Sequence, residues 1–259
     1  MMNFVCIKWG DKYEPKYVNN LYRMVQEHYH SGFTFTCLTD DPEGLNCDTQ
    51  EIPDIDPLHP KYWFGKENYC WDRSKFLVFN SHNWLGYTGK WTYFDLDIII
   101  QSDITALDEL ALKPRIIHSR WDDPRYIDDR WFIDVRGTYY NSSVMCWNND
   151  QCEHIFWESL EDEQKIFRTF FKGTDNYHYW RQRDFWNNMP YDWIYSFNRG
   201  KEFPHDISTH KYRKECKFCL FNVDSNPHPK MRQIKIDELE NETLLRFWNG
   251  NTNSKSSRQ

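Results

Sequence analysis

The chain of 259 residues is long enough to bury the core of one large domain or of two closely packed ones. Its formal net charge of -7 at pH 7 argues against nucleic acid or an anionic membrane surface as the main partner. It has no apolar run of the roughly 18 residues that a membrane span needs and no signal-peptide pattern at its start, so we expect no membrane insertion and a cytoplasmic location. Most of the eight cysteines lie in apolar segments and are expected to be buried thiols; for the CxxC of Cys216 and Cys219, a zinc or redox role is the alternative.

Apolar stretches separated by turn residues predict an α/β opening. Strands are expected over residues 3–9, 33–38 and 48–52. Apolar side chains recur at helical spacing after Pro15, which predicts a helix that ends before Gly32. Strand, helix, strand is the start of a βαβ unit and a parallel sheet.

Residues 91–100 predict a buried strand that carries two acidic side chains, Asp95 and Asp97. Being two residues apart, the carboxylates lie on the same side of an extended chain. Two like charges this close raise each other's pKa or bind a cation, and aspartate oxygens suit Mg²⁺ or Mn²⁺. In the alternative, one aspartate caps the following turn and the other is solvated.

The remaining elements follow in chain order. Helices are expected over residues 70–79, 151–171, 175–188 and 236–248. A short helix that ends at 110 is expected after an N-cap at 102–103. Strands are expected over 115–119, 140–147 and 218–223. Residues 121–138 have no clear period and predict a binding loop, and 250–259 predict a disordered tail.

The segment Phe-Asp-Leu-Asp-Ile-Ile at 94–99 resembles the DxD motif of GT-A fold glycosyltransferases, especially small bacterial and phage-type members and glycogenin-like enzymes. Residues 8–13, 39–41, 71–76 and 140–145 also resemble segments of that group, as does Gly-Thr-Asp-Asn-Tyr at 173–177. The resemblance implies a Rossmann-like α/β fold with a mostly parallel central sheet flanked by helices. It implies a single domain over 1–249, with the nucleotide bound by about 1–110 and the sugar and acceptor by about 111–249.

The same resemblance implies a metal-dependent enzyme that transfers a hexose from a nucleotide sugar to a hydroxyl acceptor. The donor would be a UDP-sugar such as UDP-glucose, the cofactor Mn²⁺ or Mg²⁺, and the acceptor a carbohydrate. A catalytically silent nucleotide-sugar-binding protein of the same fold and a sugar nucleotidyltransferase are the alternatives.

Carried over residue by residue, the resemblance makes Asp97 a direct metal ligand and Asp95 a second ligand or a ribose contact. The chain departs from the family where a late histidine completes the metal site, because Asn222 stands there; Asn222, Asp224 or His228 would complete the ligand set. The donor contacts implied are Lys8, Trp9, Gly10, Tyr13, Thr39, Asp40, Lys75, Asp95, Leu96, Asp97, Asn141, Ser142 and His228.

Two residues are candidates for the chemistry. Lys75, with Arg73 as a further possibility, would neutralise the phosphates; otherwise it lies on a solvated helix face. Asp175 would act as a general base in an inverting reaction or position the sugar in a retaining one; otherwise it is a helix N-cap. Three aromatic residues are candidates for an acceptor platform, with a core or interface role as the alternative: Trp121, Trp131 and Tyr139.

Overall fold

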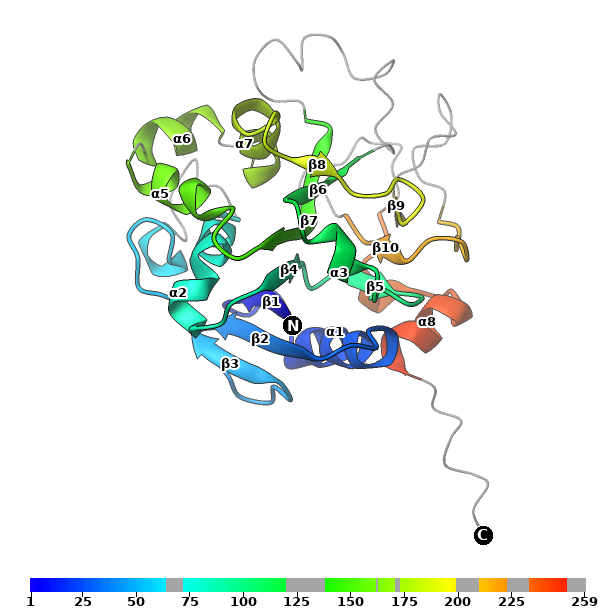
Figure 1. Cartoon of the computed structure of the whole chain (residues 1–259). Helices are drawn as coiled ribbons and strands as arrows, with labels where there is room; N and C mark the ends of the chain where they lie inside the picture. Colours follow the sequence, from blue (N-terminus) through cyan, green and yellow to red (C-terminus); the bar gives the residue numbers. More distant parts are fainter. Residues whose placement is uncertain are drawn as a thin grey trace.

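A computed structural model describes residues 1–63, 72–119, 138–161, 163–170, 173–198, 210–222 and 233–250. A seven-stranded sheet runs through it in the order β3-β2-β1-β4-β7-β6-β8, beside a three-stranded sheet in the order β5-β10-β9 (Figure 1). The first sheet consists of β1 (Met2–Lys8), β2 (Phe33–Thr39), β3 (Asp48–Glu51), β4 (Lys90–Phe94), β6 (Arg115–His118), β7 (Tyr140–Asn148) and β8 (Asn187–Asn188). The second consists of β5 (Ile98–Ile100), β9 (Ile194–Ser196) and β10 (Phe218–Leu220).

The predicted βαβ opening is confirmed. β1 pairs in parallel with both β2 and β4, and β2 pairs in parallel with β3. The helix α1 (Pro15–His28) connects β1 to β2; it begins with a proline, whose missing N–H costs nothing in the first turn. Its buried face packs beside β5 and the C-terminal helix α8 (Glu242–Asn249).

β7 is antiparallel to its neighbours β4 and β6, whereas β6 and β8 are parallel. The sheet is therefore mixed but mainly parallel, as predicted. Because β7 runs against β4, its first residues lie at the carboxyl end of β4, where Val144 pairs with Phe94. Residues near 140 and residues near 95 thus meet at one edge of the sheet.

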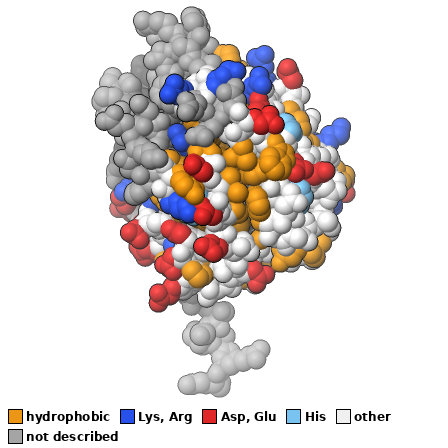
Figure 2. All heavy atoms as spheres, turned by 90° about the vertical axis from the view of Figure 1, so that its left-hand side faces the viewer, with side chains coloured by type: hydrophobic (Ala, Val, Ile, Leu, Met, Phe, Trp, Pro, Cys, Tyr) orange, Lys and Arg blue, Asp and Glu red, His pale blue; other side chains and the backbone are white. Residues whose placement is uncertain are grey.

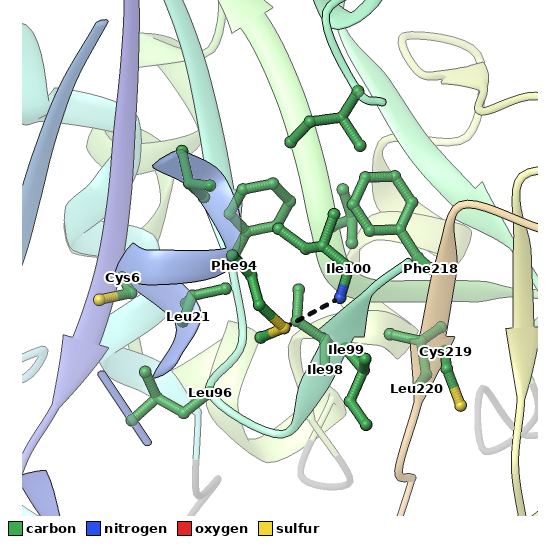
Figure 3. Packing of buried hydrophobic residues seen from close by; sticks show 14 of the residues in the cluster. Cys6, Leu21, Phe94, Leu96, Ile98, Ile99, Ile100, Phe218, Cys219 and Leu220 are labelled. Carbon is green, nitrogen blue, oxygen red and sulfur yellow. Dashed lines mark hydrogen bonds between the residues drawn. The ribbon is translucent and has the colours of Figure 1, made fainter. Parts of the chain in front are cut away.

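The prediction of one strand over 91–100 is wrong. β4 ends at Phe94, the chain bends through Asp95, Leu96 and Asp97, and Ile98 starts β5 in the other sheet. All three isoleucines of β5 have 0% exposure, which suits a strand covered on both faces. Figure 3 shows β5 packed among Leu21, Phe94, Phe218 and the other apolar residues of this cluster.

The predicted helices are shorter than expected or divided. The helix expected from residue 70 is, in its described part, a 3₁₀-helix, η2 (Arg73–Asn80), followed by α2 (Ser81–Leu85). The helix expected over 151–171 is two, α5 (Glu153–Glu161) and α6 (Glu163–Thr169). The last predicted helix is η3 (Ile236–Glu238) followed by α8.

Two further helix predictions need correction. The helix expected over 175–188 is α7 (Thr174–Arg181); it stops early because the chain turns back to place Trp186 against His178, where the indole N–H donates to Nδ1 at 3.2 Å. The helix expected from 102 begins later, as α3 (Leu107–Leu110), and Asp103 accepts from the N–H of Thr105 within the preceding turn. The short η1 (Pro60–Tyr62) was not predicted. The loop predicted at 121–138 (except for Thr138) and the tail from 251 lie outside the described residues.

Two apolar clusters cover the two faces of the large sheet. Along β1 the buried residues alternate between them: Phe4 and Cys6 belong to one and Val5 and Ile7 to the other, as an extended chain requires. Figure 2 shows apolar side chains gathered among charged ones on the face at the left of Figure 1. Among the described residues, no helix has the length and apolar character to cross a membrane.

Candidate functional site

The C-terminal ends of β1, β2 and β4 lie at the same end of the large sheet, together with the start of β7. β1 is followed by Gly10, which has a positive φ of 59°. The N–H of Gly10 donates to both carboxylate oxygens of Asp40, at 3.0 and 3.2 Å. The Thr39 hydroxyl donates to the Asp41 carbonyl at 2.9 Å. In this structure Asp40 and Thr39 therefore hold the turns that follow β1 and β2.

Aromatic side chains lie beside the end of β1. Trp9 meets Trp63 edge to face, with ring centroids 5.1 Å apart, and Tyr13 lies 4.9 Å from Tyr17. Tyr13 is also beside Asp97: burial raises the pKa of its hydroxyl, and the negative charge of Asp97 raises it further. Lys8 at the strand end is only 4% exposed. The sequence prediction did not include Trp63.

Asp95 is held by an ion pair and a tyrosine. Lys75 Nζ lies 2.9 Å from Oδ1 and 3.0 Å from Oδ2, and the Tyr93 hydroxyl donates to Oδ1 at 2.6 Å. Burial disfavours the charged carboxylate, but Lys75 and the hydrogen bonds outweigh it, so the pKa of Asp95 is lowered. Tyr93 was missed, although a residue two positions before Asp95 on a strand faces the same side.

Asp97 is the less compensated of the two carboxylates. Burial, followed by the charge of Asp95, raises its pKa to about 6. Leu96 between them is 3% exposed and belongs to the core cluster shown in Figure 3, so its side chain faces away from the site. A pair of carboxylates with one pKa raised is an arrangement that a cation would stabilise.

A third oxygen, that of Asn222, is a candidate ligand because the strand before it ends beside Asp97. The Phe221 N–H donates to the Asp97 carbonyl at 3.0 Å, which brings the end of β10 beside the acidic pair. The next residue is Asn222, whose Oδ1 is buried and has no hydrogen-bond partner within the described part of the chain. Two carboxylates and an amide oxygen are the hard ligands that Mg²⁺ and Mn²⁺ prefer, so these residues fit a divalent cation.

The described residues include no group of three or more His, Cys, Asp or Glu side chains arranged to hold a metal. An amide such as Asn222 is not in that set of residue types. The other two candidates for the third ligand, Asp224 and His228, lie outside the described residues, as do Trp121 and Trp131.

Asp175 faces β7. Its Oδ1 accepts from the N–H of Ser142 at 2.7 Å and from the Ser142 hydroxyl at 2.5 Å, while Oδ2 accepts from Asn141 Nδ2 at 3.4 Å. The N-cap of α7 is Gly173, and the alternative that Asp175 is the cap is wrong. Burial raises the pKa of Asp175 to about 6, with Lys75 opposing and Asp72 adding to the rise.

Lys75 and Ser142 together connect the carboxylates of Asp95 and Asp175. Lys75 Nζ donates to Ser142 Oγ at 3.1 Å, and the same hydroxyl donates to Asp175. Burial lowers the pKa of Lys75, but Asp95, Asp72 and Asp175 together raise it above its usual value, so the ammonium is charged at neutral pH. Its side chain is 13% exposed, which rules out the solvated helix face. Arg73 is directed elsewhere, over the Phe167 ring of α6 at 4.2 Å.

The remaining aromatic candidate, Tyr139, stacks on His118 with ring centroids 5.5 Å apart and planes at 7°. The same histidine contacts Tyr191 edge to face. Tyr139 directly precedes β7 and follows Thr138, whose hydroxyl donates to the Asp175 carbonyl at 3.2 Å. The aromatic cluster therefore adjoins Thr138, which contacts Asp175.

Solved structures with a similar fold include three glycosyltransferases. Mouse xyloside xylosyltransferase 1 matches with a TM-score of 0.55 and 12% identity, over 85% of this chain and 97% of its own. The galactosyltransferase LgtC, solved with donor and acceptor sugar analogues, matches with a TM-score of 0.55 and 12% identity, over 88% and 90%. The bifunctional glycosyltransferase WbbM matches with a TM-score of 0.52 and 11% identity. That match covers 86% of this chain but 46% of WbbM, so the chain spans about half the length of WbbM.

The sequence itself matches no family model and no curated protein. The strand order and the structural matches together show that the chain has the fold of the GT-A glycosyltransferases. The fold implied by the resemblance at residues 94–99 is thereby confirmed. At 11–12% identity the matches establish the fold, and the activity has to be argued from the site.

Proposed function

We propose that the protein is a metal-dependent glycosyltransferase that moves a hexose from a nucleotide sugar to a hydroxyl acceptor. The observation that carries this proposal is the acidic pair of Asp95 and Asp97 after β4, with Lys75 fixed beside it. In an open α/β sheet, ligands bind beyond the carboxyl ends of the strands, which is where these side chains lie. Transfer from a diphosphate needs positive charge there.

The divalent cation would be held by Asp97, Asp95 and Asn222. When bound, it supplies Lewis-acid stabilisation of the negative charge on the departing diphosphate. Lys75 adds a charged ammonium on the same side of β4, within the hydrogen-bond network that joins Asp95 to Ser142. Because this ammonium is already oriented by two partners, little reorganisation is needed when a phosphate arrives.

Asp175 is the group we assign to the sugar side. Ser142 holds Oδ1 by two hydrogen bonds, so the carboxylate is fixed in orientation. Oδ2, with only the 3.4 Å contact to Asn141 among its hydrogen bonds in the described residues, is the oxygen that would meet a sugar hydroxyl. With a pKa of about 6, Asp175 is mostly ionised at pH 7 and can accept a hydrogen bond or a proton.

The donor is proposed to be a UDP-sugar. Trp9, Trp63 and Tyr13 supply aromatic surface at the end of β1 where a base would stack. Asp40, which is exposed, would contact the ribose with the oxygen surface that Gly10 leaves free. The acceptor is proposed to be a carbohydrate bound on the Asp175 side, and the enzyme to act in the cytoplasm as one domain over 1–249.

Calorimetry with UDP, with and without Mn²⁺, tests the donor site directly. We expect metal-dependent binding of UDP, followed by release of UDP from at least one sugar in a panel of UDP-sugars. No metal-dependent binding would contradict the proposal. Binding without turnover on any donor, with or without added sugars, would support the silent binding protein, which the replacement of a metal-binding histidine by Asn222 favours. Turnover of a sugar phosphate with a nucleoside triphosphate would instead support the nucleotidyltransferase.

A further inference from the structure

Asp72 joins two parts of the site that are 102 positions apart in the sequence. Its Oδ2 accepts from the Thr174 N–H at 2.9 Å and from the Thr174 hydroxyl at 2.5 Å. Thr174 is the first residue of α7, and Asp72 comes directly before η2, which carries Lys75. The Asp72 carbonyl also accepts the N–H of Lys75 at 2.9 Å.

The backbone before Thr174 is shaped for this contact. Gly173 has a φ of 135°, a conformation that residues with a side chain rarely adopt. A Cβ at this position would stand 3.4 Å from Asp72 Oδ2. The positive φ therefore favours glycine here, whereas a Cβ would reach Asp72 only at about van der Waals contact.

We propose that Asp72 is a positioning residue, which ties the start of η2 to the start of α7 and so fixes Lys75 and Asp175 at the spacing that Ser142 bridges. The bridge has two hydrogen bonds: Lys75 donates to Ser142 Oγ at 3.1 Å, and Ser142 Oγ donates to Asp175 at 2.5 Å. The Thr174 hydroxyl, which donates to Asp72, lies 3.2 Å from Ser142 Oγ. Thr174 thus touches both Asp72 and the bridging hydroxyl. The role in catalysis rests on the proposed transferase function, while the link between the two side chains does not.

The charge of Asp72 acts on the same two groups. Burial is the main cause of the raised pKa of Asp175; Lys75 opposes the rise and the charge of Asp72 adds to it. The charge of Asp72 also helps to raise the pKa of Lys75. Removing this charge lowers the pKa of Asp175, because one nearby negative charge no longer opposes its ionisation. This effect depends on the distance between the two carboxylates, so the titration of Asp175 reports that Asp72 lies close to it, and kcat reports the positioning.

The test compares Asp72→Asn, Asp72→Ala and Thr174→Val in the full chain. Asn keeps an oxygen for the Thr174 N–H without the charge, Ala removes both, and Val keeps the shape of Thr174 without the hydroxyl. We expect kcat on the UDP-sugar to fall about tenfold in Asp72→Asn and further in Asp72→Ala, with the Kd for UDP and Mn²⁺ within about twofold of wild type. The acid limb of the kcat profile should shift to lower pH in both Asp72 variants.

A carbon-detected NMR titration of labelled aspartates gives a reading that needs no turnover. The Asp175 signal, assigned with Asp175→Asn, should titrate at lower pH in Asp72→Asn than in wild type. An inactive wild type would overturn the proposed function, and this titration would still test the link. An unchanged Asp175 titration together with wild-type kcat in Asp72→Asn would overturn the inference.

The matched control is Asp108→Asn. Asp108 is also a partly buried aspartate with two side-chain partners, accepting from the Tyr29 hydroxyl at 2.9 Å and pairing with Lys90 at 3.0 Å. It lies in α3, outside the site, so its variant should lose stability and leave kcat and the Asp175 titration unchanged. An equal loss of kcat in both variants would mean that general destabilisation explains the effect, and would overturn the inference.

Discussion

Lys75 and Asp95 form a two-contact ion pair, with Nζ 2.9 and 3.0 Å from the two oxygens and side-chain exposures of 13% and 21%. Removing the lysine leaves a poorly solvated carboxylate without its partner, which is costlier than losing an exposed pair. Lys75→Met should lower the free energy of unfolding at pH 7 by about 3 kcal/mol. Urea denaturation at pH 7 and pH 4 checks this: the deficit should shrink at pH 4, where Asp95 in the variant becomes protonated. Lys75→Arg keeps the charge and should lose less, so an equal loss at both pH values in the two variants would contradict this account.

Asp97→Asn separates binding from folding. The raised pKa of Asp97 shows that its charge opposes folding at neutral pH, because the carboxylate is buried beside Asp95. The variant should therefore unfold at the same denaturant concentration as wild type or a higher one, and lose metal-dependent UDP binding by at least about 100-fold. Calorimetry and urea denaturation measure the two effects. Retained Mn²⁺-dependent binding would mean that the cation is held elsewhere.

His178 should dominate the acid sensitivity of the α7 region. It has 0% exposure, and burial, with a smaller contribution from Lys75, lowers its pKa to about 3. The unfolded chain binds a proton near pH 6.5 and the folded chain does not, so stability is lost as the pH falls from about 6.5 towards 3. At about 1.4 kcal/mol per pKa unit the full loss is on the order of 5 kcal/mol.

The check on His178 is the pH dependence of unfolding in His178→Gln. Glutamine keeps an acceptor for the Trp186 N–H and does not titrate. The variant should be less stable than wild type at pH 7 and lose less stability on going to pH 4. If the free energy of unfolding of the variant falls with decreasing pH as steeply as that of wild type, the acid sensitivity comes from other groups.

The C-terminal helix supports the proposed base site from behind. Trp248 is 3% exposed and its ring lies 5.3 Å from that of Tyr17, which in turn contacts Tyr13. Trp248→Ala should lower the free energy of unfolding by about 3–5 kcal/mol and also weaken UDP binding, because Tyr13 loses its backing. Trp157→Ala on α5, where the side chain is 49% exposed, is the control that should change neither. Lost stability with unchanged UDP affinity would show that α8 does not support the base site.

The fold was predictable wherever one strand or helix is defined by its own pattern. The βαβ opening follows from turn residues and from the apolar spacing of α1, and both are local properties. The break between β4 and β5 was not predictable from periodicity, because Trp91 to Ile100 is apolar throughout except for Thr92 and the two aspartates. Only pairing with β10, more than 100 residues later, decides that Ile98–Ile100 joins a second sheet.

The site was predictable to a similar extent. Asp95, Lys75, Ser142 and Asp175 were proposed from sequence, and hydrogen bonds join them in the structure, with Asp97 two residues from Asp95. Asp72 was not proposed, because its partner Thr174 is distant in sequence and an aspartate before a helix has a common local explanation as a cap. The interaction between η2 and α7 depends on how both elements pack on β7, and no spacing in the sequence encodes it.

The three residues from Asp95 to Asp97 have one further consequence, because they cross from one sheet to the other. The Asp95 N–H is bonded to the Ser143 carbonyl of the seven-stranded sheet at 2.9 Å, and the Asp97 carbonyl is bonded to Phe221 beside the three-stranded sheet. The backbone of each aspartate is therefore anchored to a different sheet. If the proposed cation binds between them, its affinity depends on how the two sheets pack, so a substitution in β9 or β10 that shifts the smaller sheet should weaken cation binding without changing a proposed ligand.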